Sequence, residues 1–217
     1  MGNGDIRKPR HRVSGWKVCL VLGCLAAGWL GGEALKEAPR LQAQEDKSPE
    51  KLAPFVPTPM VVVERMLELA GVQANDVVYD MGSGDGRIVI TAAKKYGAKA
   101  VGIEIDPQLV RLARDNVKKA GVEHLVEIRQ QDVLTADISS ASVVTLYLFP
   151  EANMLLRPIL WRQLKLGARV VSNDFDMEDW LADRVDWVLD TADGLEYTLY
   201  LWQIRERPRV SPSWSNP

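Results

Sequence analysis

Short apolar runs alternate with amphipathic stretches along most of the chain. The runs expected as strands are residues 76–80, 99–106, 125–132, 142–149 and 168–174. The stretches expected as helices, which lie before and between these runs, are 58–71, 87–97, 107–121 and 150–167. Strict alternation of short strands with helices predicts a parallel sheet that is covered by helices on both faces.

Several helix ends carry residues with known preferences for those positions. Thr58 is expected as the N-cap of the first helix, with Pro59 at the first helical position. Asp106 and Pro107 open the third helix in the same way. Pro158 lies inside the fourth helix, which is expected to kink or restart there.

The pattern changes near the C-terminus. Segments 183–190 and 195–204 flank a turn that contains Asp193-Gly194, and they are expected to form an antiparallel pair. The predicted fold class is therefore α/β. It is a seven-stranded, Rossmann-like sheet, mostly parallel, with a C-terminal antiparallel hairpin and helices on both faces.

Composition excludes several kinds of active site. The formal net charge of −2 gives no overall field that attracts nucleic acid. Cys19 and Cys24 both precede the expected domain, so that domain has no disulfide framework, thiolate nucleophile or cysteine zinc site. His124 is expected to be a solvated loop residue, so a triad built on Ser/His or Cys/His has little material. We expect no metal site.

Three glycines, Gly82, Gly84 and Gly86, follow the first strand closely. Glycine at a strand end allows positive φ and lets a ligand approach the backbone, and the following helix offers free N–H groups. The spacing is D-x-G-x-G-x-G, beginning at Asp80, whereas a dinucleotide site has G-x-G-x-x-G. An acid at this position would repel a pyrophosphate, which disfavours a nicotinamide enzyme, but it suits a ligand ammonium group.

Two more acids end the next two strands. Glu104 is placed to accept from both ribose hydroxyls of a nucleoside, and Asp132 is placed to accept from an adenine amino group. A ligand that joins an amine, a carboxylate and a nucleoside fits all three acids. That ligand is S-adenosylmethionine.

With these features the chain resembles the class I S-adenosylmethionine-dependent methyltransferases over residues 55–204. Three segments carry a closer resemblance: "PFVPTP" (54–59), "DMGSGDGRIVI" (80–90) and "GARVVSNDF" (167–175). With them the chain resembles the small protein-lysine methyltransferases related to those that modify the mitochondrial ADP/ATP carrier and the ATP synthase c subunit. The resemblance implies the seven-stranded methyltransferase sheet and a protein acceptor with an accessible lysine, including membrane proteins. No nucleic acid is expected as partner, because "LYLFPE" (146–151) has no amide or acid before its proline, unlike the enzymes that methylate base nitrogens. We expect a monomeric domain.

The expected site has a cofactor part and an acceptor part. The residues expected to bind the cofactor are Thr58, Asp80, Gly82, Ser83, Gly84, Gly86, Glu104, Ile105, Asp132 and Val133. The candidate catalytic residues are Tyr147, Glu151 and Asp174, and other candidates for the acceptor wall are Phe149, Asp176 and Glu178. A small-molecule methyltransferase and a non-catalytic cofactor-binding module remain open as alternatives.

The first part of the chain has the layout of a signal or an anchor. An uncharged run at 18–32 follows a basic flank, and extended to 15–35 it is long enough to cross a bilayer. We expect membrane association if this segment is retained and export if it is cleaved; the side of the membrane stays open. The expected division is a flank plus apolar segment (1–36), a linker (37–54), the methyltransferase domain (55–204) and a tail (205–217).

Overall fold

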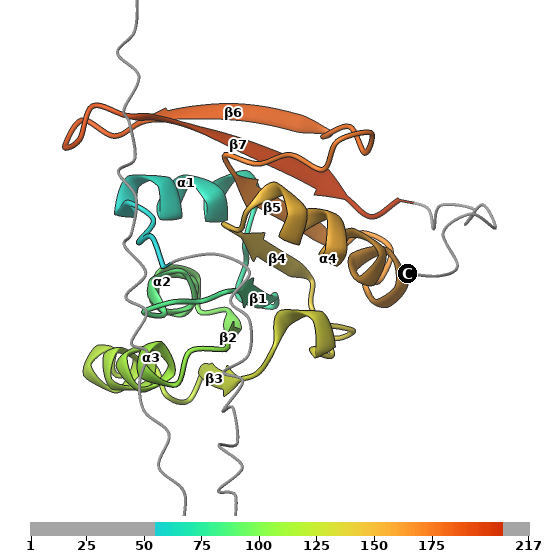
Figure 1. Ribbon diagram of the computed structural model, residues 1–217. Helices are drawn as coiled ribbons and strands as arrows, with labels where there is room; N and C mark the ends of the chain where they lie inside the picture. Colours follow the sequence, from blue (N-terminus) through green and yellow to red (C-terminus); the bar gives the residue numbers. More distant parts are fainter. Residues whose placement is uncertain (1–54, 206–217) are drawn as a thin grey trace, which may run out of the picture. The chain divides into compact units, whose positions relative to one another are not determined.

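The computed structural model describes residues 55–205, so the expected leader, linker and most of the tail lie outside the described residues. Within 55–205 the chain forms a seven-stranded sheet with strand order β3-β2-β1-β4-β5-β7-β6 (Figure 1). The strands are β1 (Val77–Met81), β2 (Lys99–Glu104), β3 (Val126–Gln130), β4 (Val143–Leu146), β5 (Arg169–Asn173), β6 (Arg184–Leu189) and β7 (Glu196–Gln203). The helices are α1 (Met60–Leu69), α2 (Arg87–Tyr96), α3 (Pro107–Ala120) and α4 (Pro150–Gln163), with a short 3-10 helix η1 (Val133–Thr135).

The pairing of the strands confirms the predicted sheet. Strands β1 to β5 pair in parallel, whereas β7 is antiparallel to both β5 and β6. The chain moves outward from β1 through β2 to β3, and then returns to place β4 on the other side of β1. This reversal of strand order lies between β1 and β4, and ligands of open α/β sheets bind at the carboxyl ends of strands at such a point.

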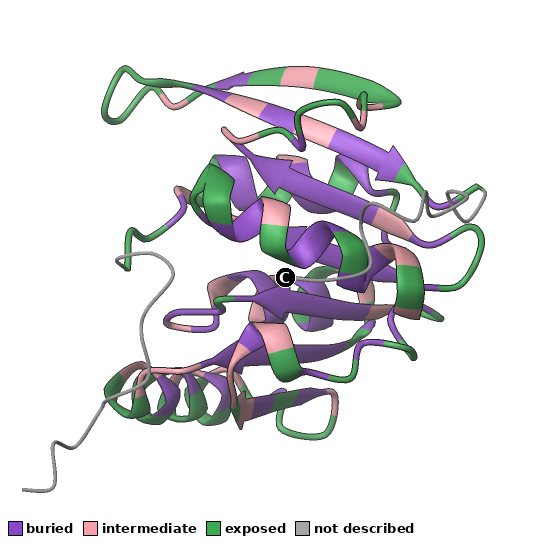
Figure 2. Cartoon of the chain, turned by 45° about the vertical axis from the view of Figure 1, so that its right-hand side comes forward, coloured by how far each residue is buried: buried purple, intermediate pink, exposed green. Residues whose placement is uncertain are grey.

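Alternation along the strands builds a hydrophobic cluster on each face of the sheet. On one face, strand residues such as Val78 and Val143 pack with α1, α2 and α3. On the other face, Tyr79 and Leu146 pack with α4 and η1. Figure 2 shows that the central strands are mostly buried, whereas the edge strand β6 is mostly exposed.

The start of the first helix differs from the prediction. Helix α1 begins at Met60, its N-cap is Pro59, and the N-cap carries no side-chain hydrogen bond. Thr58 was therefore wrongly predicted as the cap. The Thr58 carbonyl instead accepts a hydrogen bond from Arg87 Nη1 at 2.7 Å, and this bond holds the extended segment 55–58 beside the start of α2.

The end of β4 and the course of α4 also differ from the prediction. Strand β4 ends at Leu146, three residues before the predicted end, because Tyr147 and Leu148 turn to line a cavity. Of the two alternatives predicted at Pro158, the restart is wrong, because α4 continues to Gln163 as one helix, and the kink stays a prediction. Leu156 and Leu160, both fully buried, hold the two halves of α4 against the sheet on either side of the proline.

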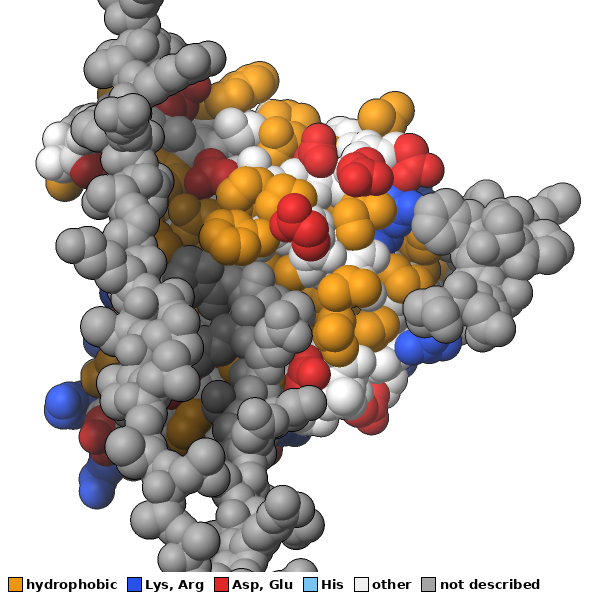
Figure 3. All heavy atoms as spheres, in the orientation of Figure 1, with side chains coloured by type: hydrophobic (Ala, Val, Ile, Leu, Met, Phe, Trp, Pro, Cys, Tyr) orange, Lys and Arg blue, Asp and Glu red, His pale blue; other side chains and the backbone are white. Residues whose placement is uncertain are grey.

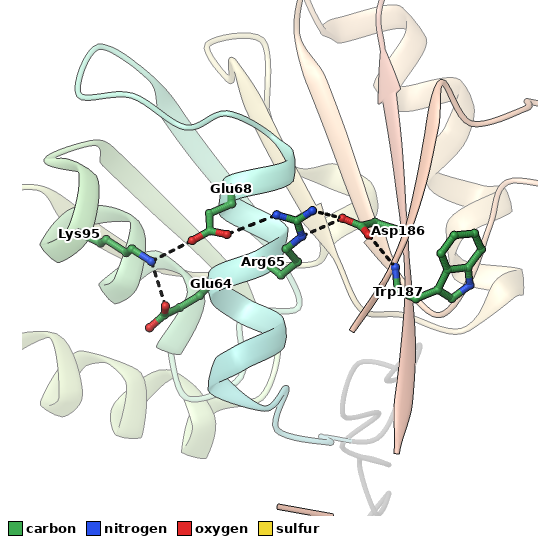
Figure 4. Close-up of polar contacts among 6 residues, drawn as sticks. All are labelled: Glu64, Arg65, Glu68, Lys95, Asp186 and Trp187. Atoms are coloured by element: carbon green, nitrogen blue, oxygen red, sulfur yellow. Dashed lines mark hydrogen bonds and ion pairs between the residues drawn. The ribbon is translucent and has the colours of Figure 1, made fainter. Parts of the chain in front are cut away.

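A chain of ion pairs connects α2, through α1, to the edge strand β6 (Figure 4). Lys95 Nζ lies 2.9 Å from Glu64 and 3.2 Å from Glu68, and Glu68 lies 3.5 Å from Arg65. Arg65 Nε then donates to Asp186 Oδ2 at 2.8 Å. Because β6 is otherwise paired only along β7 in the described sheet, these contacts give it a second attachment.

We expect Arg65→Ala to lower the free energy of unfolding by about 0.5 kcal/mol, since partly exposed ion pairs contribute in that range. Urea unfolding at low salt measures the change. The difference should shrink at 1 M salt, where screening weakens the pairs that the wild type retains. A loss of the same size at both salt concentrations would attribute the effect to packing of the arginine stem and not to its charge.

Candidate functional site

A cavity of about 360 Å³ lies at the carboxyl ends of β1, β2 and β4, next to the reversal of strand order. This volume is within the range of small-molecule sites. The predicted cofactor residues that line it are Thr58, Asp80, Gly82, Ser83, Gly84, Glu104, Ile105, Asp132 and Val133, and the predicted catalytic residue Tyr147 lines it as well. Gly86, Glu151 and Asp174 do not.

The loop after β1 is shaped by its glycines. Gly82 and Gly84 have φ angles of 84° and 54°, which favour glycine. An added Cβ at Gly82 would lie 2.9 Å from Leu148 Cδ2, and one at Gly84 would lie 2.4 Å from the Phe55 ring. The backbone of this loop therefore forms part of the cavity wall where side chains have no room.

Gly86 has a different place. It is the N-cap of α2, with φ 82°, and an added Cβ would lie 3.3 Å from the Ala113 Cβ. The absence of a side chain at Gly86 thus allows α2 to start close to α3. The structure gives Gly86 a packing role, and its contact with a cofactor stays a prediction.

Asp80 is a buried carboxyl group near the end of β1, and its residue is 3% exposed. Its Oδ1 accepts a hydrogen bond from Thr145 Oγ1 at 2.7 Å. Burial raises the pKa of Asp80 to about 7; the Thr145 hydroxyl opposes this shift, and the charges of Glu104 and Asp85 add to it. A cationic ligand group beside Asp80 would stabilise its ionised form.

Glu104 is held by backbone N–H groups on both carboxylate oxygens. Its Oε2 accepts from Gly84 N, and its Oε1 accepts from Ile105 N and Asp106 N, all at 2.9 Å. A carboxylate has about four acceptor positions, and the three N–H groups occupy three of them, so one position on Oε2 remains for a ligand hydroxyl. Glu104 thus combines a fixed orientation with a remaining acceptor position that suits a ribose hydroxyl.

Asp132 lies at the end of the segment that follows β3. Its Oδ1 accepts from Leu134 N at 2.9 Å and so caps η1. Among residues 55–205 its Oδ2 has no protein donor, and Asp132 lines the cavity. The position remains consistent with the predicted contact to an adenine amino group.

The predicted catalytic residues lie at the β4–β5 side of the site. Tyr147 is half-buried, and burial, the Asp174 charge and a hydrogen bond to Asp174 raise its pKa. Asp174 has a positive φ of 61°, and its Oδ1 accepts from Thr198 N at 3.0 Å. Glu151 is exposed in the first turn of α4. Tyr147 and Asp174 are therefore brought together, while Glu151 stays at the surface.

Sequence reasoning missed part of the cavity wall. Phe55, Val56 and Pro57 line the cavity together with Thr58, although only Thr58 was predicted. Arg87 holds this segment through the Thr58 carbonyl, and Asp85 in turn binds the Arg87 guanidinium, with Nε at 2.9 Å from its Oδ1. The proline-rich "PFVPTP" stretch was the available signal for an extended segment.

These residues fit S-adenosylmethionine. The glycine backbone provides close approach, Asp80 suits an ammonium group, Glu104 suits a ribose hydroxyl, and Asp132 suits an adenine amine. Among residues 55–205 the structure has no group of three or more His, Cys, Asp or Glu that could hold a metal ion. No helix in the same range is long and apolar enough to cross a membrane.

Comparison with known proteins agrees with this geometry. Residues 80–184 match the family model of the ANTKMT methyltransferase domain. The chain is 46% identical to a protein-lysine N-methyltransferase of Saccharolobus islandicus, over 70% of this chain and 94% of that protein. It is 34% identical to the human lysine N-methyltransferase of the ATP synthase c subunit, over 66% of this chain but only 58% of that protein.

A solved structure is similar over nearly its whole length. It is a Salinibacter ruber protein in complex with S-adenosylhomocysteine, described as an RNA methyltransferase. The sequence identity is 56% over 72% of this chain and 97% of that one, with a TM-score of 0.65.

Proposed function

This chain belongs to the ANTKMT methyltransferase domain family, and from that membership we propose that it methylates lysine side chains of protein acceptors. It is an S-adenosylmethionine-dependent methyltransferase. The observation that carries the proposal is the cavity itself. Asp80, the glycine backbone and Glu104 meet there in the arrangement that a nucleoside joined to an amino acid requires, and Tyr147 forms the wall toward β5.

When bound, S-adenosylmethionine supplies a methyl group on a sulfonium. Transfer of this group to a neutral amine forms an N–C bond and breaks the C–S bond, whose electron pair stays on sulfur. The nitrogen is left with a surplus proton. The protein has to orient the acceptor and exclude water. Tyr147 and Leu148 line the cavity on the side of β4, and we place the entry of the acceptor on this side.

A lysine acceptor must lose its proton before it can attack. Removal of the ammonium group from water lowers its pKa, which favours the neutral amine. Asp174 lies beside Tyr147 and is fixed by Thr198, so its carboxylate is placed to take a proton. We assign this role to Asp174 and a contact with the acceptor to Tyr147. Glu151 lies at the surface, and we assign it a contact with the substrate as the substrate approaches the cavity.

RNA is the second candidate acceptor, because the Salinibacter ruber protein is described as an RNA methyltransferase. The charge of this chain at the site argues for protein. Glu151, Asp174, Asp176 and Glu178 follow β4 and β5, and they would repel phosphates. Figure 3 shows hydrophobic and acidic side chains interspersed on the face turned to the viewer, with basic side chains toward its margins.

The acceptor we propose includes membrane proteins. Relatives at 34% and 35% identity are named as lysine methyltransferases of the ATP synthase c subunit and of the adenine nucleotide translocase. Attachment of this chain to a membrane through residues 15–35 would bring it close to such acceptors. That segment lies outside the described residues, so the attachment is part of the proposal.

The test is the partition of a labelled methyl group. The full chain in detergent is incubated with methyl-labelled S-adenosylmethionine and cell lysate, which is then separated into membrane protein, soluble protein, RNA and small molecules. We expect label in protein that hydrolyses to methyl-lysine. Label confined to RNA would favour the second candidate, and label confined to small molecules would contradict both.

A further inference from the structure

Three aromatic rings lie in sequence from the cavity wall to the surface. Tyr147 lines the cavity, and its ring stacks on that of Phe175, with centroids 6.4 Å apart and planes at 23°. Phe149 meets Phe175 edge to face, with centroids 6.1 Å apart. Phe149 is 44% exposed, whereas Tyr147 and Phe175 are half-buried, so the group connects the cavity to solvent.

Helix α4 fixes the position of Phe175. Asn153, which is fully buried, donates from Nδ2 to the Phe175 carbonyl at 3.2 Å and to Ser172 Oγ at 3.2 Å. One turn further along α4, Arg157 donates to the Met177 carbonyl at 2.9 Å. The loop after β5 is thus held by α4 at successive points.

The order of the strands decides which side of the cavity receives the acceptor. Glu104 and Asp132 place the nucleoside toward β2 and β3, on one side of β1. The acceptor must then approach from the other side, where β4 and β5 end. The aromatic group and Asp174 lie on that side.

We propose that Tyr147, Phe149 and Phe175 form the slot through which a lysine side chain reaches the cavity, and that Asn153 is the positioning residue of this slot. This inference rests on the proposed function. Aromatic faces pack against the four methylenes of lysine and attract its ammonium group by cation–π interaction. They also displace water from the nitrogen, which favours its neutral form next to the Asp174 carboxylate.

The first test replaces Phe175. We expect Phe175→Leu to raise the apparent KM for the acceptor by about 10-fold or more, because the cation–π and stacking contacts are lost. Phe175→Tyr keeps the ring and should stay within about threefold of the wild type. Trp187→Leu is the matched control, since Trp187 is a 61% exposed aromatic on β6 that contributes nothing to the slot.

The acceptor probe is detergent-solubilised membrane protein from the source organism, with methyl-labelled cofactor and the full chain. Affinity for S-adenosylhomocysteine, measured by calorimetry, should change less than twofold in all three variants. A raised acceptor KM with unchanged cofactor affinity supports the slot. Phe175→Leu with wild-type KM and kcat would overturn it and leave the proposed function standing, whereas no methyl-lysine from the wild type would remove the proposed function itself.

The positioning role of Asn153 needs a separate variant. Asn153→Asp has the same shape but replaces the Nδ2 donor with an oxygen that faces the Phe175 carbonyl. We expect a raised KM for the acceptor with cofactor affinity unchanged. Equal losses in acceptor KM and cofactor affinity would show a general structural effect and contradict the assignment.

Discussion

Gly84→Val is expected to lower affinity for S-adenosylhomocysteine by more than about 100-fold, as measured by calorimetry. Gly84 has φ 54°, where a β-branched residue is strained by roughly 1–3 kcal/mol. The new Cβ would also lie 2.4 Å from the Phe55 ring, so the wall at 55–58 must shift. Because Gly84 N donates to Glu104, the carboxylate would lose one of its fixed contacts as well.

Gly121→Val is the matched control for this prediction. Gly121 has φ 69°, and an added Cβ there would meet nothing within 4 Å. It ends α3, away from the cavity lining. The control should therefore carry the backbone strain and lower the unfolding free energy, while cofactor affinity stays as in the wild type. Equal affinity losses in both variants would mean that strain, and not the cavity, explains the result at Gly84.

Asp80→Asn is expected to lower cofactor affinity by roughly 10- to 100-fold at pH 8, since a hydrogen bond to a charged group contributes about 1.5–3 kcal/mol. In the wild type, affinity should also fall below pH 7, because the pKa of Asp80 is raised to about 7 and the ligand ammonium group favours the ionised carboxylate. Calorimetry between pH 6 and 8 measures both effects. The variant should show no such pH dependence.

Asp80 also predicts how stability changes with pH when no ligand is bound. Between the ordinary pKa of 3.8 and about 7 the native state holds a proton that the unfolded chain releases. The contribution of Asp80 to stability is therefore complete below that window and is lost as the pH rises through about 7. Urea unfolding of wild type and Asp80→Asn across this range should show the decline only in the wild type.

Asp76 is the matched control carboxylate, because it precedes β1 at the opposite end of the strand. Burial opposes its ionisation, but Ser142, the Gln73 N–H group and Arg169 outweigh burial and lower its pKa. Its stabilising contribution is thus present at neutral pH and lost in acid. Asp76→Asn should destabilise the fold at pH 7 and leave cofactor affinity unchanged. A loss of affinity in this variant would contradict the assignment of the ammonium site to Asp80.

The sequence predicted the sheet because the signals for it are local. Hydrophobic alternation identified the strands, and Asp106 caps α3 as expected, accepting from Gln108 N at 2.7 Å. The turn at Asp193-Gly194 joins an antiparallel pair as predicted. Parallel strands bring the acids at their carboxyl ends to the same edge of the sheet. The sequence could therefore predict that Asp80, Glu104 and Asp132 line one cavity.

Other features depend on contacts between distant segments. Thr58 has the chemistry of a cap, but its carbonyl is held by Arg87, and no local pattern in the sequence shows this bond. Phe55 lines the cavity three residues before Thr58, and no local pattern predicts this position either. Phe175 was missed for a similar reason, since its position is set by Asn153 on a different element.

Tandem mass spectrometry can show whether this cavity serves methyl transfer to a lysine side chain. The full chain is incubated with deuteromethyl-labelled S-adenosylmethionine and solubilised membrane protein, with Gly84→Val in parallel. We expect deuteromethyl groups on lysine Nζ with the wild type and none with the variant. Bound cofactor with no deuteromethyl group on any lysine would contradict this function.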